Sequence, residues 1–322
     1  MVVVLAGGVG AARFLRGLTA AVDPAAITVV VNVGDDVELH GLRICPDLDS
    51  ITYWLTDLVH PEQQWGRADE RFTVRDELER LGHEPWFTLG DRDLALHLHR
   101  TALLREGVPL STVTADVAAR HGLALRLLPA SDDRVETRIH TTDGRDLGFQ
   151  RWWVGERAAP DVADVEYRGA ATAQPAPGVV EAIERADAIV IAPSNPVVSI
   201  APITAVPGIA AALRSTAAPI VGISPIIHGR VVRGMAHRLL PAVGTAVDAA
   251  AVGLAYGARR DGGLLDGWVL DTADADGLER LHAAGLAATA TATLMDDPEL
   301  ARRLARTSLE LVGVDPAAAG RG

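Results

Sequence analysis

Short apolar runs recur along the whole chain and alternate with stretches of helical periodicity, and this alternation limits the possible folds more than any other feature. The runs predict buried strands at Val2 to Ala6, Ile27 to Asn32, Ala124 to Leu128, Ala188 to Ala192, Ile220 to Ile223 and Gly267 to Leu270. Strands that alternate with helices are typical of a mostly parallel sheet covered by helices on both faces. The sequence therefore predicts an α/β fold of this kind.

A long segment between the second and third predicted strands carries few strand signals. Its periodicity predicts helices at residues 50–59, 73–81, 91–104 and 112–121. We therefore divide the chain into an α/β core of residues 1–46 and 123–322 and a helical insertion of residues 47–122 that covers the active site. Residues 134–152 alternate around Asp143-Gly144, which predicts a hairpin and a small antiparallel extension. A last helix is expected from about Asp297 to Val312.

Charge and composition exclude several classes of protein. The 322 residues carry a formal net charge of −12, which argues against a nucleic-acid partner because such binding relies on basic patches. The apolar runs are too short for a bilayer and no basic leader precedes the first strand, so we expect no membrane partner and a cytoplasmic location. The chain has no lysine, which excludes a lysine-based phosphate loop. A lone cysteine, Cys45, excludes a disulfide framework.

A glycine-rich turn follows the first strand and includes Gly7, Gly8 and Gly10. Glycines let the backbone approach an anion closely, and the N-terminus of the following helix offers free N–H groups. Arg13 lies one turn into that helix, where its guanidinium can add a charge-assisted contact. The spacing does not fit the dinucleotide-binding fingerprint. An anion-binding turn and a tight turn without a ligand are both open from these residues.

Four aspartates follow the second strand within fifteen residues: Asp35, Asp36, Asp47 and Asp49. Crowded carboxylates repel one another unless a cation holds them, and together with phosphate oxygens and water they are the usual ligands of magnesium. Loops after the strands of an open α/β sheet carry its ligands, so we predict Asp36 and Asp49 as catalytic residues and Mg²⁺ ligands. The alternatives are an ordinary turn for Asp35 and, for Asp47 or Asp49, a cap on the helix that begins near Ser50; we prefer the cap for Asp47 and function for Asp49.

Polar loops also follow two later strands. Ser194-Asn195 comes after the strand that ends at Ala192, and Ser224 comes after the strand that ends at Ile223. Hydroxyl, amide and backbone groups in such loops can bind phosphates or a nucleobase. Their position at successive strand ends favours one composite site with the glycine turn.

A further segment, Leu89-Gly90-Asp91-Arg92-Asp93, precedes a predicted helix. Asp91 is an expected N-cap, whereas Arg92 has no such structural role and is a candidate for substrate binding. His97 and His99 are too close in sequence to share one helix face, so we interpret both as structural or solvated.

Taken in order, these segments resemble the 2-phospho-L-lactate transferase and phosphoenolpyruvate transferase family of deazaflavin coenzyme (coenzyme F-420) biosynthesis. The matching segments are Gly7 to Leu15, Asn32 to Asp36 with Cys45 to Asp49, Leu89 to Asp93, Pro193 to Pro196, and Ser224 to Ile226. The resemblance implies a Rossmann-like fold, magnesium dependence and a homodimer. It also implies transfer of a phospho-lactyl or phosphoenolpyruvyl group from a guanosine diphosphate conjugate to the ribityl hydroxyl of the deazaflavin Fo (7,8-didemethyl-8-hydroxy-5-deazariboflavin), with release of GMP.

By the same resemblance, Asp49 and Arg92 contact the deazaflavin, Asp36 and Asp49 lie near the metal, and the Ser194-Asn195 and Ser224 loops hold the guanosine diphosphate part. Phosphoryl transfer asks a protein mainly to align the attacking hydroxyl and to offset charge on the phosphoryl oxygens. We therefore expect Asp36→Ala or Asp49→Ala to abolish turnover and to leave thermal unfolding nearly unchanged.

Two other interpretations compete with this one. Non-catalytic nucleotide-sugar-binding regulatory proteins of the gluconeogenesis-factor type share the fold and the glycine turn, but their paired aspartates precede a glycine-serine run. Here Val37-Glu38-Leu39-His40 follows instead, which favours the enzyme. A nicotinamide dehydrogenase is disfavoured by the glycine spacing. The acid carried by the donor, lactate or enolpyruvate, is left open.

Overall fold

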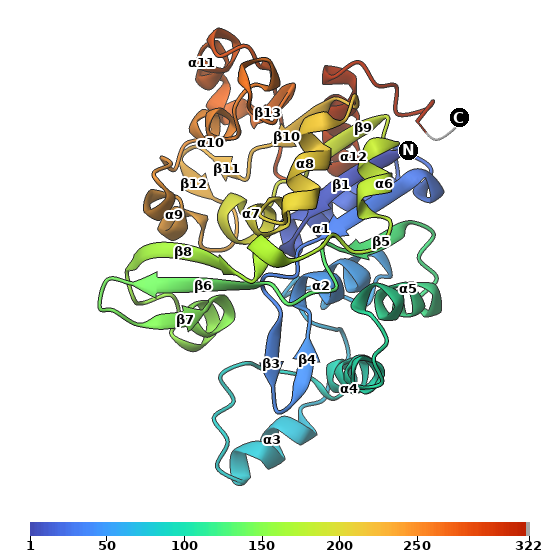
Figure 1. Cartoon of the computed structure of the whole chain (residues 1–322), viewed down its shortest axis with the longest axis vertical. Helices are drawn as coiled ribbons and strands as arrows, with labels where there is room; N and C mark the ends of the chain where they lie inside the picture. The colour runs from blue at the N-terminus through green and yellow to red at the C-terminus, as the bar shows by residue number, and fades with distance from the viewer. Residues whose placement is uncertain (320–322) are drawn as a thin grey trace.

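The structure is a computed structural model that describes residues 1–319, and its centre is a seven-stranded parallel sheet (Figure 1). The strand order is β14-β13-β10-β9-β1-β2-β5. The strands are β1 (Val2–Ala6), β2 (Ile27–Val31), β5 (Arg126–Pro129), β9 (Ala188–Ile191), β10 (Ile220–Ile223), β13 (Gly267–Asp271) and β14 (Ala287–Thr291). Helices flank the sheet, so the predicted Rossmann-like α/β fold is confirmed.

The central strands read as continuous apolar runs because both faces of the sheet are covered. All residues of β1 and β2 are buried, and β1 pairs in parallel with β2 on one side and with β9 on the other. Side chains alternate between the faces of a sheet, so a strand covered on both faces needs apolar residues at every position. The edge strand β14 is half-exposed and consists of alanine and threonine, and its composition gave no strand signal.

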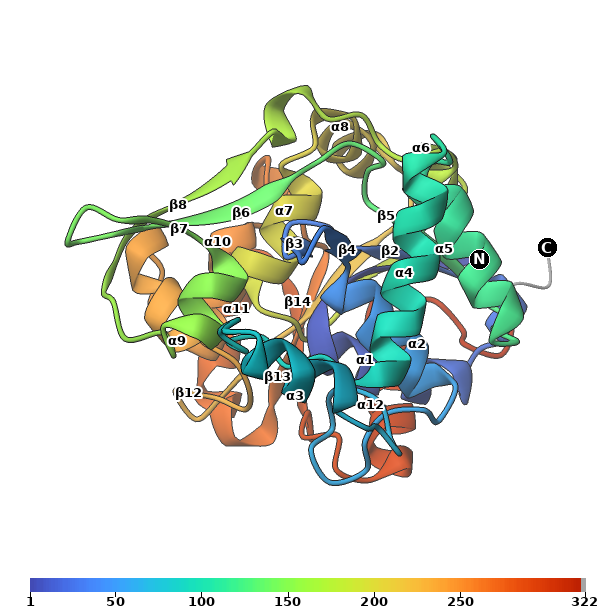
Figure 2. The ribbon, with the colours of Figure 1, turned by 90° about the horizontal axis from the view of Figure 1, so that it is seen from below.

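Helices lie on both sides of the sheet (Figure 2). On one side, α1 (Gly8–Thr19) packs against α2 (Pro46–Leu55) and α12 (Pro298–Leu311). On the other side, α6 (Val179–Glu184) packs against α8 (Pro207–Ser215). Within residues 1–319, no single helix combines the length and apolar composition of a membrane span, and the segments 196–204 and 207–215 pass that test only together, bent by 85°.

The segment between β2 and β5 contains a short hairpin, β3 (Val37–Leu39) with β4 (Leu42–Ile44), followed by α2, α3 (Thr73–Arg80), α4 (Asp91–Arg105) and α5 (Leu110–Arg120). These helices lie at the predicted places, although α2 begins four residues earlier than expected. Pro46 opens α2, since proline suits the first helical position, and so Asp47 and Asp49 fall in its first turn. The division of the chain into a core and an insertion stays a prediction.

A three-stranded antiparallel sheet, in the order β7-β6-β8, extends from the core (Figure 1). Strands β6 (Glu136–Thr141) and β7 (Asp146–Gly148) are the expected hairpin, and Gly144 adopts a φ of +84° in the turn between them. The third strand, β8 (Val162–Arg168), was not predicted. The chain after β10 forms a second small hairpin, β11 (Ile226–Ile227) with β12 (Arg230–Val231).

The remaining helices are short and connect the later strands. They are α7 (Ala201–Thr204), α9 (Ala236–Leu239), α10 (Ala249–Tyr256) and α11 (Leu278–Ala283). Two five-residue π-helical turns, Arg151–Gly155 and Pro196–Ile200, lie near the ends of β7 and β9. Such turns are frequent at functional sites.

Candidate active site

A cavity of about 570 Å³ opens at the carboxyl end of the parallel sheet. Loops after β1, β2, β9, β10 and β14 contribute to its wall, together with α2, α4 and the segment around the first π-helical turn. The strand order runs in opposite directions from the boundary of β1 and β9, and open α/β sheets bind their ligands at such a point. The volume suits a small-molecule site.

Most of the predicted site residues lie in the wall of this cavity, which we call the main cavity. They are Gly7, Gly8, Gly10, Arg13, Asp49, Ser194, Asn195 and Ser224. Asp36 lies instead in the wall of an adjacent cavity of about 200 Å³, and Asp35 borders both. Arg92 is exposed on α4 and lines neither of these two cavities. The functional roles of all these residues stay predictions.

The glycine turn is packed so closely that larger residues do not fit. A Cβ atom on Gly10 would lie 2.3 Å from the carbonyl oxygen of Pro193, and one on Gly7 would lie 2.7 Å from the Asp47 carboxylate. Gly8 adopts a φ of +69°, and its N–H donates to Oδ1 of Asp47 over 2.8 Å. The turn therefore packs against the loop after β9 and the first turn of α2, and the Asp47 carboxylate from α2 accepts the N–H of the first residue of α1.

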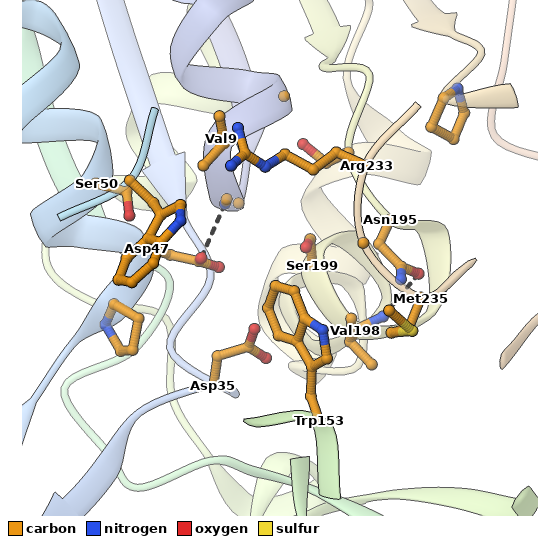
Figure 3. A pocket seen from close by; sticks show the side chains of 18 of the residues that line it. Val9, Asp35, Asp47, Ser50, Trp153, Asn195, Val198, Ser199, Arg233 and Met235 are labelled. Atoms are coloured by element: carbon orange, nitrogen blue, oxygen red, sulfur yellow. Dashed lines mark hydrogen bonds between the residues drawn. The ribbon is translucent and has the colours of Figure 1, made fainter. Parts of the chain in front are cut away.

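The acidic pair Asp35 and Asp47 points into the main cavity from two sides (Figure 3). Asp47 accepts hydrogen bonds from Gly8 and, over 2.9 Å, from the side chain of Asn32. Burial raises the pKa of Asp47 to about 7. Burial and the nearby charge of Asp47 also raise the pKa of Asp35, whose Oδ1 atom has no hydrogen-bond partner. The sequence was misleading here, because we preferred a helix cap for Asp47 and it is a cavity residue.

Asp36 and Asp49, the two predicted metal ligands, each face an arginine. Oδ2 of Asp36 lies 2.9 Å from Nη2 of Arg43 and accepts a hydrogen bond from the thiol of Cys45 over 3.1 Å. Both oxygens of Asp49 accept hydrogen bonds from the buried guanidinium of Arg100. Arg43 and Arg100 thus bring a positive charge to each carboxylate, although burial still raises the pKa of Asp36 and its Oδ1 atom has no hydrogen-bond partner among the described residues.

A second polar wall of the main cavity comes from α2 and α4. Tyr53 donates a 2.7 Å hydrogen bond to Asp93, and burial raises the pKa of Asp93 to about 6. His97 is buried beside Asp49 and Arg100, and burial lowers its pKa to about 4, so the imidazole is neutral. Positions 49 and 53, and positions 93 and 97, are four residues apart and so lie on one face of each helix. That spacing was the signal by which Tyr53 and Asp93 could have been found.

The opposite side of the main cavity consists of loops after β9 and β10. The side-chain oxygen of Asn195 accepts hydrogen bonds from the backbone of Val197 and Val198 and so caps its own turn (Figure 3). The hydroxyl of Ser224 is likewise bonded to the backbone of Ile226. The buried hydroxyl of Ser194 lines the main cavity and has no hydrogen-bond partner among the residues that the structure describes.

The mouth of the main cavity is apolar and partly exposed. Trp65, Val232 and Leu294 line it, and 48% of the surface of Trp65 is exposed. Trp153 projects into the same space from the first π-helical turn (Figure 3). Exposed aromatic and aliphatic surface of this kind suits a flat, apolar ring system.

The acidic pair fits a divalent cation better than the predicted ligands do. Within residues 1–319, no group of three or more histidine, cysteine or acidic side chains is arranged to hold a metal ion. Magnesium, however, is commonly bound by one or two carboxylates together with substrate phosphates and water. Asp35 and Asp47 are two buried carboxylates that have no arginine partner within residues 1–319, and their mutual repulsion is what a cation would relieve.

Comparison with known proteins points to one family. The model of the family described as 2-phospho-L-lactate transferase CofD matches residues 2–310. The chain is 51% identical over 315 residues to the phosphoenolpyruvate transferase of Kitasatospora aureofaciens, with 96% of this chain and 97% of that protein covered. It is 46% identical over 328 residues to the phosphoenolpyruvate transferase of Mycolicibacterium smegmatis, with 97% and 99% covered.

A solved structure supports the fold. The crystal structure of a member of the UPF0052 family from Bacillus halodurans matches with a TM-score of 0.65 and covers 96% of this chain and 98% of that chain. The two sequences are 19% identical, so this likeness concerns the fold alone.

Proposed function

The chain belongs to the 2-phospho-L-lactate transferase CofD family, and we propose that it transfers a phosphoenolpyruvyl group from a guanosine diphosphate conjugate to the ribityl hydroxyl of the deazaflavin Fo, with release of GMP. The names of the similar proteins favour enolpyruvate over lactate as the acid of the donor. A cytoplasmic location and a homodimer stay predictions. The observation that carries the proposal is the meeting of the glycine turn, the acidic pair and the apolar mouth around one cavity.

The reaction exchanges one phosphorus–oxygen bond for another. The oxygen of the ribityl hydroxyl forms a bond to the phosphorus that carries the three-carbon acid, and the bond from that phosphorus to the bridging anhydride oxygen breaks. GMP leaves with the bridging oxygen, and the hydroxyl proton passes to a base. No covalent enzyme intermediate is needed, so the protein has to align the two substrates and to offset negative charge.

We assign the donor to the side of the main cavity formed by the glycine turn and the Ser194 loop. The first-turn amides of α1 and the buried hydroxyl of Ser194 offer hydrogen-bond donors to phosphate oxygens. We assign the deazaflavin ring to the apolar mouth beside Trp65 and Trp153. This arrangement places the acceptor alcohol between the mouth and the acidic pair.

We further propose that Asp35 and Asp47 hold a magnesium ion, in place of Asp36 and Asp49. Bound there, the ion would offset the charge of the phosphate oxygens. Removal of the hydroxyl proton needs a base whose pKa is close to the working pH. Asp93, with a pKa raised to about 6, lines the main cavity and meets that condition.

The test is a direct one. The purified protein is incubated with Mg²⁺, Fo and either the enolpyruvyl or the lactyl conjugate of guanosine diphosphate, and the products are weighed by mass spectrometry. We expect the enolpyruvyl conjugate to give the Fo ester and GMP in equal amounts, and EDTA to stop the reaction. Absence of any ester with both donors, in protein that melts cooperatively, would refute the proposal.

A further inference from the structure

Two arginine side chains lie at the mouth of the main cavity, and they differ in their partners. Nη2 of Arg13 lies 2.9 Å from the carboxylate of Asp296. The guanidinium of Arg233 donates instead to the backbone oxygen of Gln63 over 2.6 Å and to the side-chain oxygen of Gln64 over 3.3 Å. Both of these acceptors are neutral. In the part of the chain that the structure describes, Arg233 therefore has no carboxylate partner.

The side chain of Arg233 spans the opening of the main cavity. It leaves the loop between β12 and α9 and extends across the cavity toward Val9, at the beginning of α1 (Figure 3). Its partners Gln63 and Gln64 belong to the coil that also supplies Trp65 to the cavity wall. The guanidinium of Arg233 thus connects the loop after β12 with the coil around Gln63, two parts of the cavity wall that are far apart in the sequence. It lies close to Val9, next to the glycine turn (Figure 3).

Charge is unevenly distributed along the main cavity. The inner wall carries carboxylates, whereas the mouth carries the two guanidinium groups. Arg13 and Arg233 line the same cavity, and partial burial together with the positive charge of Arg13 lowers the pKa of Arg233. An anion placed near these guanidinium groups and the first-turn amides of α1 beyond Gly8, whose own N–H already donates to Asp47, would offset that positive charge.

We infer that Arg233 binds an oxyanion of the donor, either a phosphate or the carboxylate of the three-carbon acid, and thereby positions the donor above the glycine turn. The inference rests on the proposed function. In the free protein the guanidinium is held by Gln63 and Gln64, and the donor exchanges these neutral acceptors for a charged one. The exchange adds a Coulomb attraction between the guanidinium and the oxyanion that the neutral acceptors Gln63 and Gln64 do not supply, so it favours binding.

The test compares affinities by calorimetry for GDP and for the enolpyruvyl conjugate of guanosine diphosphate. The variants are Arg233→Gln, Arg233→Lys and Arg230→Gln, the last an exposed arginine of β12 outside the cavity wall. We expect Arg233→Gln to weaken binding of the conjugate on the order of tenfold to a hundredfold, because one charge-assisted contact is lost. Arg233→Lys should restore part of the affinity, and Arg230→Gln should bind normally. Melting temperatures of all three should match the wild type.

The two ligands identify the anion. An equal loss for GDP and the conjugate places Arg233 on the diphosphate, and a loss for the conjugate alone places it on the carboxylate. Wild-type affinity of Arg233→Gln for both ligands would overturn the inference while leaving the proposed function standing. A wild-type protein that binds neither ligand would overturn the proposed function and the inference with it.

Discussion

The inner wall of the main cavity and the small antiparallel sheet both bring aspartates and arginines together, yet the two clusters behave in opposite ways. On the sheet, Asp146 bonds to Arg138 and Arg168, and these contacts lower its pKa to about 2. In the cavity, burial raises the pKa of Asp47 to about 7. The sheet cluster is mostly exposed and internally paired, whereas Asp35 and Asp47 are buried and have no arginine partner among residues 1–319. Burial without a cationic partner, rather than acidic composition, is therefore our reason for proposing the acidic pair as the functional cluster.

The largest expected difference between the clusters is in turnover. Asp35→Asn and Asp47→Asn should each lower kcat on the order of a thousandfold, because a bound metal ion supplies several kcal/mol of transition-state stabilisation. The matched substitution on the sheet, Asp146→Asn, should leave kcat unchanged. The measurement is GMP release at saturating substrates and Mg²⁺.

The variant Asp36→Asn distinguishes the two assignments of the metal site. The sequence alone predicted Asp36 and Asp49 as the ligands, whereas we propose the acidic pair. Asparagine can still accept a hydrogen bond from Arg43, so the surrounding contacts are largely kept. A thousandfold loss in Asp36→Asn together with normal turnover in Asp47→Asn would restore the original assignment and contradict ours.

A second difference is expected in stability. Asp49→Ala leaves the buried guanidinium of Arg100 without its carboxylate, and breaking a buried ion pair in this way costs about 3–5 kcal/mol. Asp146→Ala removes a carboxylate that is 41% exposed and should change the free energy of unfolding little. Urea unfolding of both variants measures the contrast. The sequence predicted near-normal unfolding for Asp49→Ala because it gave no sign of Arg100 as a partner, and an unchanged midpoint would support that earlier expectation.

The smallest expected effect is on the pH dependence of melting. Asp47 has a folded-state pKa of about 7, above its ordinary value of 3.8, so the folded protein binds its proton more tightly than the unfolded chain. Its contribution to stability is complete below about pH 4 and is lost as the pH rises through about 7. Asp47→Asn should therefore gain a few degrees in Tm relative to the wild type between pH 5 and pH 8.

Asp146 provides the control for this titration. Its pKa is lowered to about 2, so its contribution is present above about pH 4 and is lost only as the pH falls through about 2. Asp146→Asn should leave the slope between pH 5 and pH 8 as it is in the wild type. Identical slopes for wild type and Asp47→Asn would show that Asp47 does not carry the raised pKa.

Much of the fold could be predicted from the sequence, because the buried strands of a parallel sheet consist of short runs of apolar residues. The first and fifth predicted strands match β1 and β10 at both ends, and the hairpin around Gly144 was marked by its turn residues. Strand β14 was missed because three of its five residues are alanine, which is depleted in strands, and it contains no large apolar residue. The sequence thus predicted those strands and turns whose own residues carry a clear apolar or turn-forming pattern.

The candidate site was less accessible, since its decisive contacts join distant parts of the chain. The glycine turn and the strand-end loops were found, because a loop that follows a parallel strand must lie at the carboxyl end of the sheet, where such sheets bind their ligands. The choice among the four aspartates depended on Arg43 and Arg100, and the latter lies 51 residues beyond Asp49. Arg233 lies in a loop without a motif, and its proposed role follows from its place in the cavity wall and from its neutral partners Gln63 and Gln64. A contact between residues that are far apart in the chain cannot be recognised from the spacing of residues in the sequence.

The wall of the main cavity draws on residues from Gly7 to Met295, which is nearly the whole described chain. No half of the polypeptide could carry the site alone, and a proteolytic nick in the exposed coil around Gln63 would detach one wall from the others. A molecule that fills the cavity therefore ties the first strand-end loop to the last, and its binding energy is added to the stability of the entire fold. Occupancy should raise a single, cooperative melting transition and should also slow digestion at sites far from the ligand.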